Sequence, residues 1–105
     1  MKLRFLTEAE AESKAAANHY EEQQEGLGAE FLDAVALALR AIERDPFRFA
    51  RIQKPRTKRE IRQHNVKRFP YSVVYERIDT EFVVLAIAHA KRHPSYWLRR
   101  KTDDD

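Results

Sequence analysis

Residues Phe82–Ala88 form an uninterrupted apolar run inside a predicted strand, Glu81–Ala90. A strand that is apolar at every position is typical of the centre of a sheet, because a half-exposed strand alternates apolar with polar residues. Asp79-Thr80 reads as a two-residue turn, so the preceding strand, Phe69–Ile78, is expected to form a hairpin with it. Two further strands complete a small, mainly antiparallel sheet: Lys2–Leu6 and Ile61–Val66.

Two helices are predicted between the first and second strands. The first, Glu8–Gln24, begins at a capping box in which the Thr7 hydroxyl accepts from an early helical amide and Glu10 reaches back. The second, Ala29–Arg44, has apolar residues spaced by four, four and three, the period of a helix packed on a core: Phe31, Val35, Leu39 and Ile42.

Glycine and proline mark the ends of these helices. Gly26-Leu27-Gly28 stops the first helix, because glycine accepts the left-handed backbone of a helix end. Asp45-Pro46 stops the second, because the residue before proline is disfavoured in helical geometry. So short a turn between two helices predicts an antiparallel hairpin. Residues 47–58, which include Pro55, are expected to form an irregular basic loop.

The predicted element order is therefore β-α-α-β-β-β. The fold class is α+β, with the helical hairpin packed on one face of the sheet. A chain of 105 residues is expected to form a single domain. We assign this domain to residues 1–98 and a charged C-terminal tail to residues 99–105, of which Asp103–Asp105 are expected to fray.

Basic and acidic residues are distributed unevenly along the chain. Residues 1–45 hold 5 basic and 10 acidic side chains, a net charge of −5, whereas residues 46–105 hold 15 basic and 7 acidic side chains, a net charge of +8. Such asymmetry concentrates positive potential on part of the surface and favours an anionic partner, either nucleic acid or an acidic protein segment. The alternative is a solvated basic loop that only keeps the protein soluble.

Composition also removes several kinds of site. There is no cysteine, so disulfides and thiolate metal sites are excluded, and neither a metal ion nor another cofactor is expected. No apolar run reaches the roughly 18 residues that a membrane helix needs, and the first residues lack a run of signal-peptide length. The protein is expected to act in the cytoplasm without membrane contact.

Five segments carry a further signal through their order and spacing: Glu8–Tyr20, Gly26–Phe31, Ile42–Pro46, Phe69–Tyr75 and Val84–Trp97. Together they resemble the RelE/ParE superfamily of bacterial toxin–antitoxin systems, and with the first strand they cover nearly the whole chain. The resemblance implies a compact toxin that inhibits growth until a cognate antitoxin protein neutralises it.

The same resemblance implies one of two targets. ParE-like members bind DNA gyrase, whereas RelE-like members enter the ribosome and cleave messenger RNA. RelE-like nucleases combine basic residues on the second and third strands with an arginine after the last strand and a nearby tyrosine. Arg92 matches that arginine, and Tyr96 lies near the place of the tyrosine. The three strand positions that are basic in those nucleases are uncharged in this chain: Gln63, Asn65 and Ser72. A ParE-like gyrase inhibitor is therefore favoured.

The candidate site residues differ between these two functions. A nuclease would use Arg92, His89, His64 and Tyr96, with the histidines and Lys67 replacing the missing basic groups. A gyrase inhibitor would bind its target through basic side chains: Arg59, Arg62, Lys67, Arg68, Lys91 and Arg92. An antitoxin with apolar and acidic side chains is expected to cover this surface. A third alternative is a non-toxic relative that binds only its antitoxin or nucleic acid.

Some of these side chains also have purely structural interpretations. His89 ends a buried strand, where a histidine is more often packed than catalytic. Tyr71 and Tyr75 lie on one face of their strand and are expected in the core. Trp97 either anchors a partner or covers the end of the core.

Overall fold

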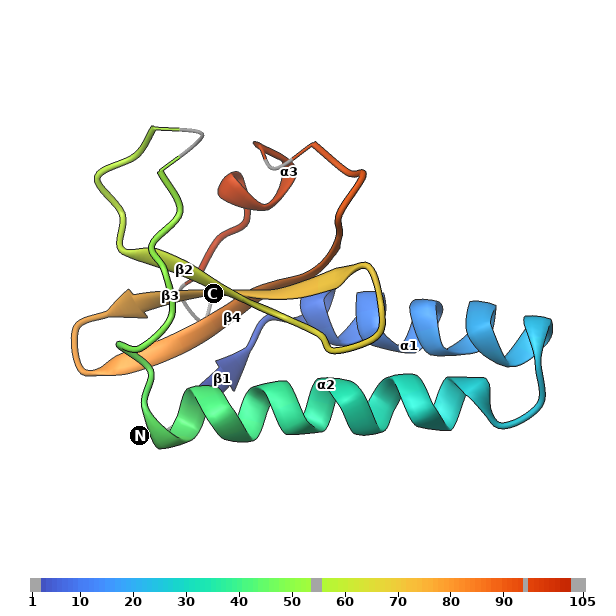
Figure 1. Cartoon of the computed structure of the whole chain (residues 1–105). Coiled ribbons are helices and arrows are strands. Elements are labelled where there is room, and N and C mark those ends of the chain that lie inside the picture. The colour runs from blue at the N-terminus through green and yellow to red at the C-terminus, as the bar shows by residue number, and fades with distance from the viewer. Residues whose placement is uncertain (1–2, 54–55, 94, 103–105) are drawn as a thin grey trace.

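The computed structural model describes residues 3–53, 56–93 and 95–102, and Figure 1 shows its elements. They are β1 (Leu3–Phe5), α1 (Thr7–Gln23), α2 (Leu27–Arg44), β2 (Ile61–Asn65), β3 (Tyr71–Ile78), β4 (Glu81–His89) and α3 (Ser95–Leu98). The predicted order β-α-α-β-β-β is confirmed, and a short α3 that the sequence did not indicate follows it. Lys2, Pro55 and Asp103–Asp105, for which we stated expectations, lie outside the described residues.

The four strands form one sheet in the order β1-β4-β3-β2. β1 pairs with β4 in parallel, and the other two pairings are antiparallel, so the sheet is mainly antiparallel as expected. β4 is buried from Phe82 to Ile87, because it has strands on both edges and cover on both faces. The prediction that the apolar run forms a central strand is confirmed.

α1 and α2 pack as an antiparallel hairpin on one face of the sheet (Figure 1). The apolar stripe of α2 supplies buried side chains to the core, among them Phe31 and Ile42. Four aromatic rings pack together beside it, with centroids 5.0 to 5.3 Å apart in the closest pairs: Tyr20, Phe31, Phe69 and Tyr71. Tyr75 lies in the core, where its hydroxyl donates to the Pro46 carbonyl at 2.7 Å, and the half-buried Tyr71 packs against the same core.

The opposite face of the sheet is covered by the loop between α2 and β2 and by α3 (Figure 1). Trp97 of α3 is 2% exposed, and Ile52 of the loop packs against the same core. Trp97 therefore covers the core and is not a surface anchor. The loop also protects the outer edge of β2, where the Ile52 amide donates to the Ile61 carbonyl at 2.8 Å and the Gln63 amide donates to the Ala50 carbonyl at 3.3 Å.

The start of α1 differs from the sequence-based expectation. The helix begins at Thr7, so the N-cap position is Leu6, and no side chain caps it. The Leu6 backbone is fixed instead by the end of the β1–β4 pairing, with its amide donating to the Val84 carbonyl at 3.1 Å. The capping-box prediction is wrong because strand pairing, and not a hydroxyl group, sets where the helix starts.

The two glycines between the helices have separate roles. Gly26 has a φ of 87° and is the left-handed residue of the turn, but it is the N-cap residue of α2. α1 already ends at Gln23, and its C-cap residue, Gln24, is extended, so the prediction that a left-handed glycine ends the first helix is wrong. Gly28 lies within the first turn of α2, and a Cβ there would lie 2.5 Å from the Ala17 carbonyl oxygen of α1. The Glu21 carboxylate of α1 accepts from the amides of Gly26 and Gly28 at 2.9 and 3.0 Å, and so caps the start of α2. Close approach of the two helices, and not chain reversal, explains Gly28.

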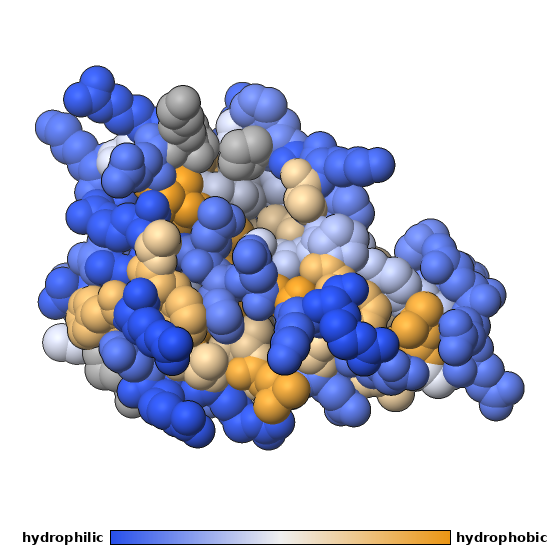
Figure 2. Space-filling view, viewed as in Figure 1, coloured by the Kyte–Doolittle hydropathy of each residue, from blue (hydrophilic) through white to orange (hydrophobic). Residues whose placement is uncertain are grey.

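The exposed surface is polar, with isolated apolar side chains. Leu32, Leu37 and Phe47 are 44%, 60% and 50% exposed. Figure 2 shows one face, on which the hydrophobic surface is divided into separate patches among hydrophilic side chains. Within the described residues, no helix combines the length and apolar character needed to cross a membrane.

Candidate functional site

Two chain segments that carry basic side chains meet at one end of the sheet. The β2–β3 turn, residues 66–70, lies beside the residues that follow β4, because Tyr71 at the start of β3 pairs with His89 at the end of β4. The Ala90 amide donates to the Pro70 carbonyl at 2.8 Å and joins the two segments. Four exposed side chains define what we name the cationic end: Lys67, Arg68, Lys91 and Arg92.

Arg68 has a defined position in the β2–β3 turn. Its φ is 76°, and its guanidinium donates to the Glu30 carboxylate of α2 at 3.0 Å while lying 5.6 Å from the centroid of the Phe69 ring. The Arg68 side chain is nevertheless 62% exposed, so this surface ion pair orients the charge without removing it from solvent.

Arg92 is stacked on an aromatic ring. Its guanidinium carbon lies 3.7 Å from the centroid of the Tyr96 ring, and that of Arg100 lies 4.9 Å from the same centroid. Arg92 also lies 3.7 Å from the Glu12 carboxylate, yet 57% of its side chain is exposed. Burial and the Glu12 carboxylate raise the pKa of Tyr96 to about 12. Tyr96 therefore stays protonated near neutral pH, and its ring serves to orient Arg92.

Glu12 of α1 joins the C-terminal segment to β4. Its carboxylate accepts two hydrogen bonds from Arg100, at 2.9 and 2.8 Å, and one from the Ile87 amide at 3.0 Å. Arg100 also donates to the Leu85 carbonyl at 2.7 Å. β1 pairs with β4 only as far as Val84, so these side chains satisfy backbone groups on the part of the β4 edge that β1 leaves free.

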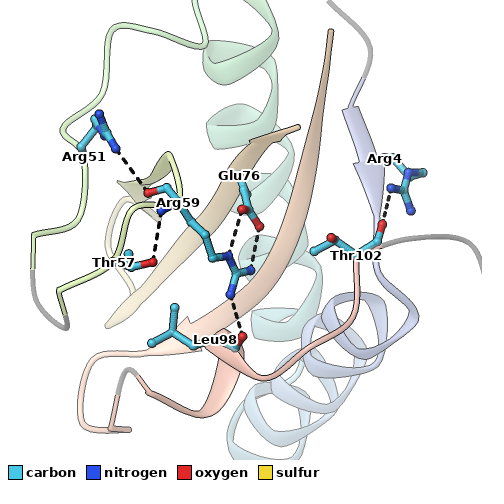
Figure 3. Close-up of polar contacts among 7 residues, drawn as sticks. All are labelled: Arg4, Arg51, Thr57, Arg59, Glu76, Leu98 and Thr102. Carbon is cyan, nitrogen blue, oxygen red and sulfur yellow. Dashed lines mark hydrogen bonds and ion pairs between the residues drawn. The ribbon is translucent and has the colours of Figure 1, made fainter. Parts of the chain in front are cut away.

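Arg59 is partly buried and its guanidinium has internal hydrogen-bond partners (Figure 3). Its guanidinium donates to the two carboxylate oxygens of Glu76 on β3 at 2.9 and 2.7 Å, and to the Leu98 carbonyl at the end of α3 at 2.7 Å. Its amide donates to the Thr57 hydroxyl at 3.1 Å, and its carbonyl accepts from Arg51 at 3.3 Å. Arg59 therefore ties the loop, β3 and α3 together.

Arg62 of β2 also has internal partners. Its guanidinium donates to the Phe49 carbonyl at 3.1 Å, pairs with the Glu60 carboxylate and lies 5.4 Å from the centroid of the Phe47 ring. Its side chain is 12% exposed, and its hydrogen bond lowers the pKa of Glu60. The structure does not bring Arg59 or Arg62 into the cationic end.

The two candidate catalytic histidines lie in different environments. His64 pairs with Val73 and so points to the face of the sheet that carries the helices. Its ring stacks on Phe49 at 3.9 Å and 22°, and burial, with a contribution from Arg48, lowers its pKa. His89 lies at the end of β4, where its Nδ1 accepts from the Lys91 amide at 3.0 Å. Only His89 is near Arg92.

A pocket of about 220 Å³ opens on the other face of the sheet, beside the cationic end. Two of the three strand positions that the resemblance implies are basic in RelE-like nucleases, Gln63 and Ser72, line this pocket, whereas Asn65 does not. Among its described lining residues only Arg92 and His89 are ionisable: Ile52, Gln63, Ser72, Val74, Ala88, His89, Ala90, Arg92 and Trp97. The Ser72 hydroxyl donates to the Asn65 side-chain oxygen at 2.9 Å. Such a pocket can bind an anion but offers few groups that move protons.

Metal chemistry has no evident site in the described part of the chain. There, no group of three or more histidine, cysteine, aspartate or glutamate side chains is arranged to hold a metal ion.

Comparison with known proteins decides the family. A family model described as "ParE toxin of type II toxin-antitoxin system, parDE" matches residues 3–94. The chain belongs to the ParE toxin family. A solved structure described as "Chromosomal ParDE TA system from P. aeruginosa" shares the fold, with a TM-score of 0.70 and 18% sequence identity over 87% of this chain and 97% of that chain. No curated protein matches the sequence.

Membership of the ParE family confirms two predictions from the sequence, namely that the chain resembles the RelE/ParE superfamily and that it is closer to ParE-like than to RelE-like members. The protein is thus the toxin component of a type II toxin–antitoxin system, and a cognate antitoxin is its partner.

Two residues that organise the site of this ParE-family toxin were missing from the sequence-based candidates. Arg100 falls in the predicted charged tail, but its side chain is only 13% exposed, and that of Glu12 is 15% exposed. Figure 3 shows a further contact of this segment, in which Arg4 of β1 donates to the Thr102 carbonyl. Glu12 had a detectable signal, because it lies on the buried stripe of α1 between Ala9 and Ala16. A carboxylate on such a stripe indicates a paired charge.

Proposed function

We propose that this ParE-family toxin arrests growth in the cytoplasm by binding DNA gyrase, and that it does not cleave RNA. The observation that supports this most is the composition of the pocket beside the cationic end, where Gln63 and Ser72 replace basic side chains of nuclease members. RNA cleavage requires preorganised donors for the charge that develops on the phosphate and on the leaving oxygen. One arginine and one histidine are a weak set for that task, but they suit a binding surface.

The cationic end is the proposed contact with the gyrase–DNA complex. Its lysines and arginines come from two segments joined by the Ala90–Pro70 hydrogen bond, and all four side chains are exposed. They would meet DNA phosphates or acidic side chains of gyrase, so binding is expected to weaken as salt concentration rises. Arg59 and Arg62 are left out of this contact because their guanidinium groups have internal partners.

Neutralisation follows from the same geometry. An antitoxin with acidic and apolar side chains that covers the cationic end would compete directly with the target.

Two double variants test the proposed target. Lys91→Gln/Arg92→Gln removes two charges from the cationic end, whereas Arg40→Gln/Arg44→Gln removes two exposed charges from α2 and serves as the matched control. We expect the wild-type chain and the control to inhibit supercoiling by purified gyrase and to cause filamentation with intact transcripts. The concentration of the Lys91→Gln/Arg92→Gln variant that gives the same inhibition should be about tenfold higher than that of wild type. A tenfold change corresponds to the loss of one charge-assisted contact.

The rival functions give different results in the same cells. If the wild-type chain cuts transcripts at codon boundaries within minutes of induction, and the Arg92→Ala variant leaves them intact, the protein is a RelE-like ribosome-dependent nuclease. Normal growth with active gyrase would identify a non-toxic relative.

A further inference from the structure

A second pocket with a cationic lining, of about 340 Å³, lies in the loop between α2 and β2, and we name it the loop pocket. Its described lining residues are rich in hydrogen-bond donors, and none of them is acidic: Arg51, Ile52, Gln53, Arg56 and Thr57. None of these residues belongs to the cationic end, so the contact proposed for that surface leaves the loop pocket without a role.

Positive charge around the loop pocket is not neutralised inside the molecule. Residues 46–59 hold six basic and no acidic side chains. Glu60 follows the loop and Glu76 contacts it, but both carboxylates already accept from other arginines. Arg51 and Arg56 are exposed, and neither has a carboxylate partner in the part of the chain that the structure describes. The pocket therefore favours an anion.

Hydrogen bonds to Arg59 hold two of the donors in place (Figure 3). The Thr57 hydroxyl oxygen accepts from the Arg59 amide at 3.1 Å, so the hydroxyl proton remains free to be donated. Arg51 uses one of its N–H groups on the Arg59 carbonyl, at 3.3 Å, and keeps the others. Arg59 is itself fixed by Glu76 and by the Leu98 carbonyl. Guanidinium and hydroxyl groups on a fixed backbone suit a phosphate group.

The loop pocket adjoins the pocket beside the cationic end. Ile52 lines both pockets, and Arg92 lines the second one. The loop and the segment that contains α3 also lie on the same face of the sheet (Figure 1). The cations of the loop and Arg92 are therefore on one side of the molecule, where an extended anion can reach both.

We propose that the loop pocket binds a backbone phosphate of duplex DNA, so that the toxin contacts the gyrase–DNA complex through two cationic sites. The inference rests on the proposed function, which brings the toxin to the DNA that gyrase holds. Ile52 is the only apolar side chain among the described lining residues, whereas a protein partner fills the centre of its interface with apolar groups. A DNA backbone instead presents phosphate oxygens at regular intervals, which match neighbouring cationic sites.

Fluorescence anisotropy with a labelled DNA duplex of about 20 base pairs, in the absence of gyrase, tests the proposal. We expect the wild-type chain to bind with a Kd on the order of 10 μM at low salt. Arg51→Gln/Arg56→Gln should weaken binding about tenfold, and the dependence of log K on log salt concentration should become less steep by about one to two, because each phosphate contact contributes about 0.9.

The matched control is Arg40→Gln/Arg44→Gln, which removes two exposed charges from the helical layer on the other face of the sheet. It should stay within about twofold of wild type, with the same salt dependence. Arg56→Gln alone removes a side chain that has no hydrogen bond among the described residues, so it leaves the loop intact and should still weaken binding about threefold.

Two further probes separate DNA from other anions. Inorganic phosphate, added at constant ionic strength, should not displace the duplex, because a single ion makes only one of the two contacts. A blocked octaglutamate peptide should bind about tenfold more weakly than the duplex and should not respond to the loop substitutions. Displacement by inorganic phosphate would identify a free ion as the ligand, and tight binding of the peptide through the loop arginines would identify an acidic protein. Either result would overturn the proposal.

Failure of the loop pocket can be distinguished from failure of the proposed target. A wild-type chain that does not bind the duplex, or equal weakening by the loop pair and the control pair, would overturn the loop pocket even if gyrase is inhibited. A chain that binds the duplex through the loop arginines but leaves supercoiling unchanged would retain the loop pocket as a DNA site and refute gyrase as the target.

Discussion

The Glu76 carboxylate is buried beneath the loop and α3, and Arg59 donates to both of its oxygens. Arg59→Met is expected to lower the free energy of unfolding by about 2 kcal/mol, because it leaves a buried carboxylate without its cation. Arg51→Met removes an exposed side chain with one hydrogen bond in the same segment and should cost at most about 0.5 kcal/mol. Urea unfolding followed by Trp97 fluorescence measures both, and equal midpoints would contradict a stabilising pair.

Burial raises the pKa of Tyr75 from 10.0 to about 12. The folded state holds this proton more tightly than the unfolded state, so the contribution to stability is complete below pH 10 and is lost as the pH rises from 10 towards 12. Unfolding free energies should fall over this window, and less steeply in Tyr75→Phe. Tyr96 contributes in the same window, so the variant reduces the slope without abolishing it. An unchanged slope would show that the Tyr75 phenol titrates alike in both states.

Among the secondary-structure elements, the helical hairpin depends on Gly28. Gly28→Ala should destabilise the protein by about 2 kcal/mol, because the new Cβ meets the Ala17 carbonyl and α1 must shift as a unit. Gly26→Ala should cost about 1 kcal/mol, the strain of a left-handed residue in open space. Ala29→Ser, an exposed change in the same turn, is the control and should stay within about 0.5 kcal/mol. A larger loss for Gly26→Ala than for Gly28→Ala in chemical denaturation would contradict this ranking.

Elements with a strong local pattern could be predicted from the sequence, and those set by distant contacts could not. The stripe of α2 and the apolar run of β4 identified both elements, because each pattern reflects burial of its own residues. The start of α1 depends on Leu6 meeting Val84 across the sheet. α3 has only four residues and is held by burial of Trp97, so no periodic signal marks it.

For the whole molecule, charge could be predicted from the sequence, but its accessibility could not. Arg59, Arg62, Lys67 and Arg68 look alike as a basic stretch. Glu76 is remote from Arg59 in the chain, and the Phe49 carbonyl that binds Arg62 belongs to the irregular loop. Which of these four cations reach solvent is therefore decided by tertiary contacts: Lys67 and Arg68 in the β2–β3 turn are exposed, whereas Arg59 and Arg62 are partly buried against their partners.

The distribution of charge over the molecule leads to a prediction about rates. Residues 1–45, a range that includes β1, α1 and α2, carry a net charge of −5, whereas the rest of the chain carries +8. This asymmetry should steer the cationic end towards an anionic partner. Lys67→Gln/Arg68→Gln should slow association with the gyrase–DNA complex about tenfold at low ionic strength, and only about twofold at high salt, where the field is screened.

The control for this experiment has the same change in net charge at the other pole. Arg40→Gln/Arg44→Gln, on the acidic helical layer, should leave the association rate within about twofold of wild type, as measured by surface plasmon resonance across a salt series. Equal slowing by the two pairs would mean that net charge alone matters. If Lys67→Gln/Arg68→Gln slows association by the same factor at low and high salt, these residues make a close contact in the rate-limiting step. Either outcome would contradict long-range steering by the charge asymmetry.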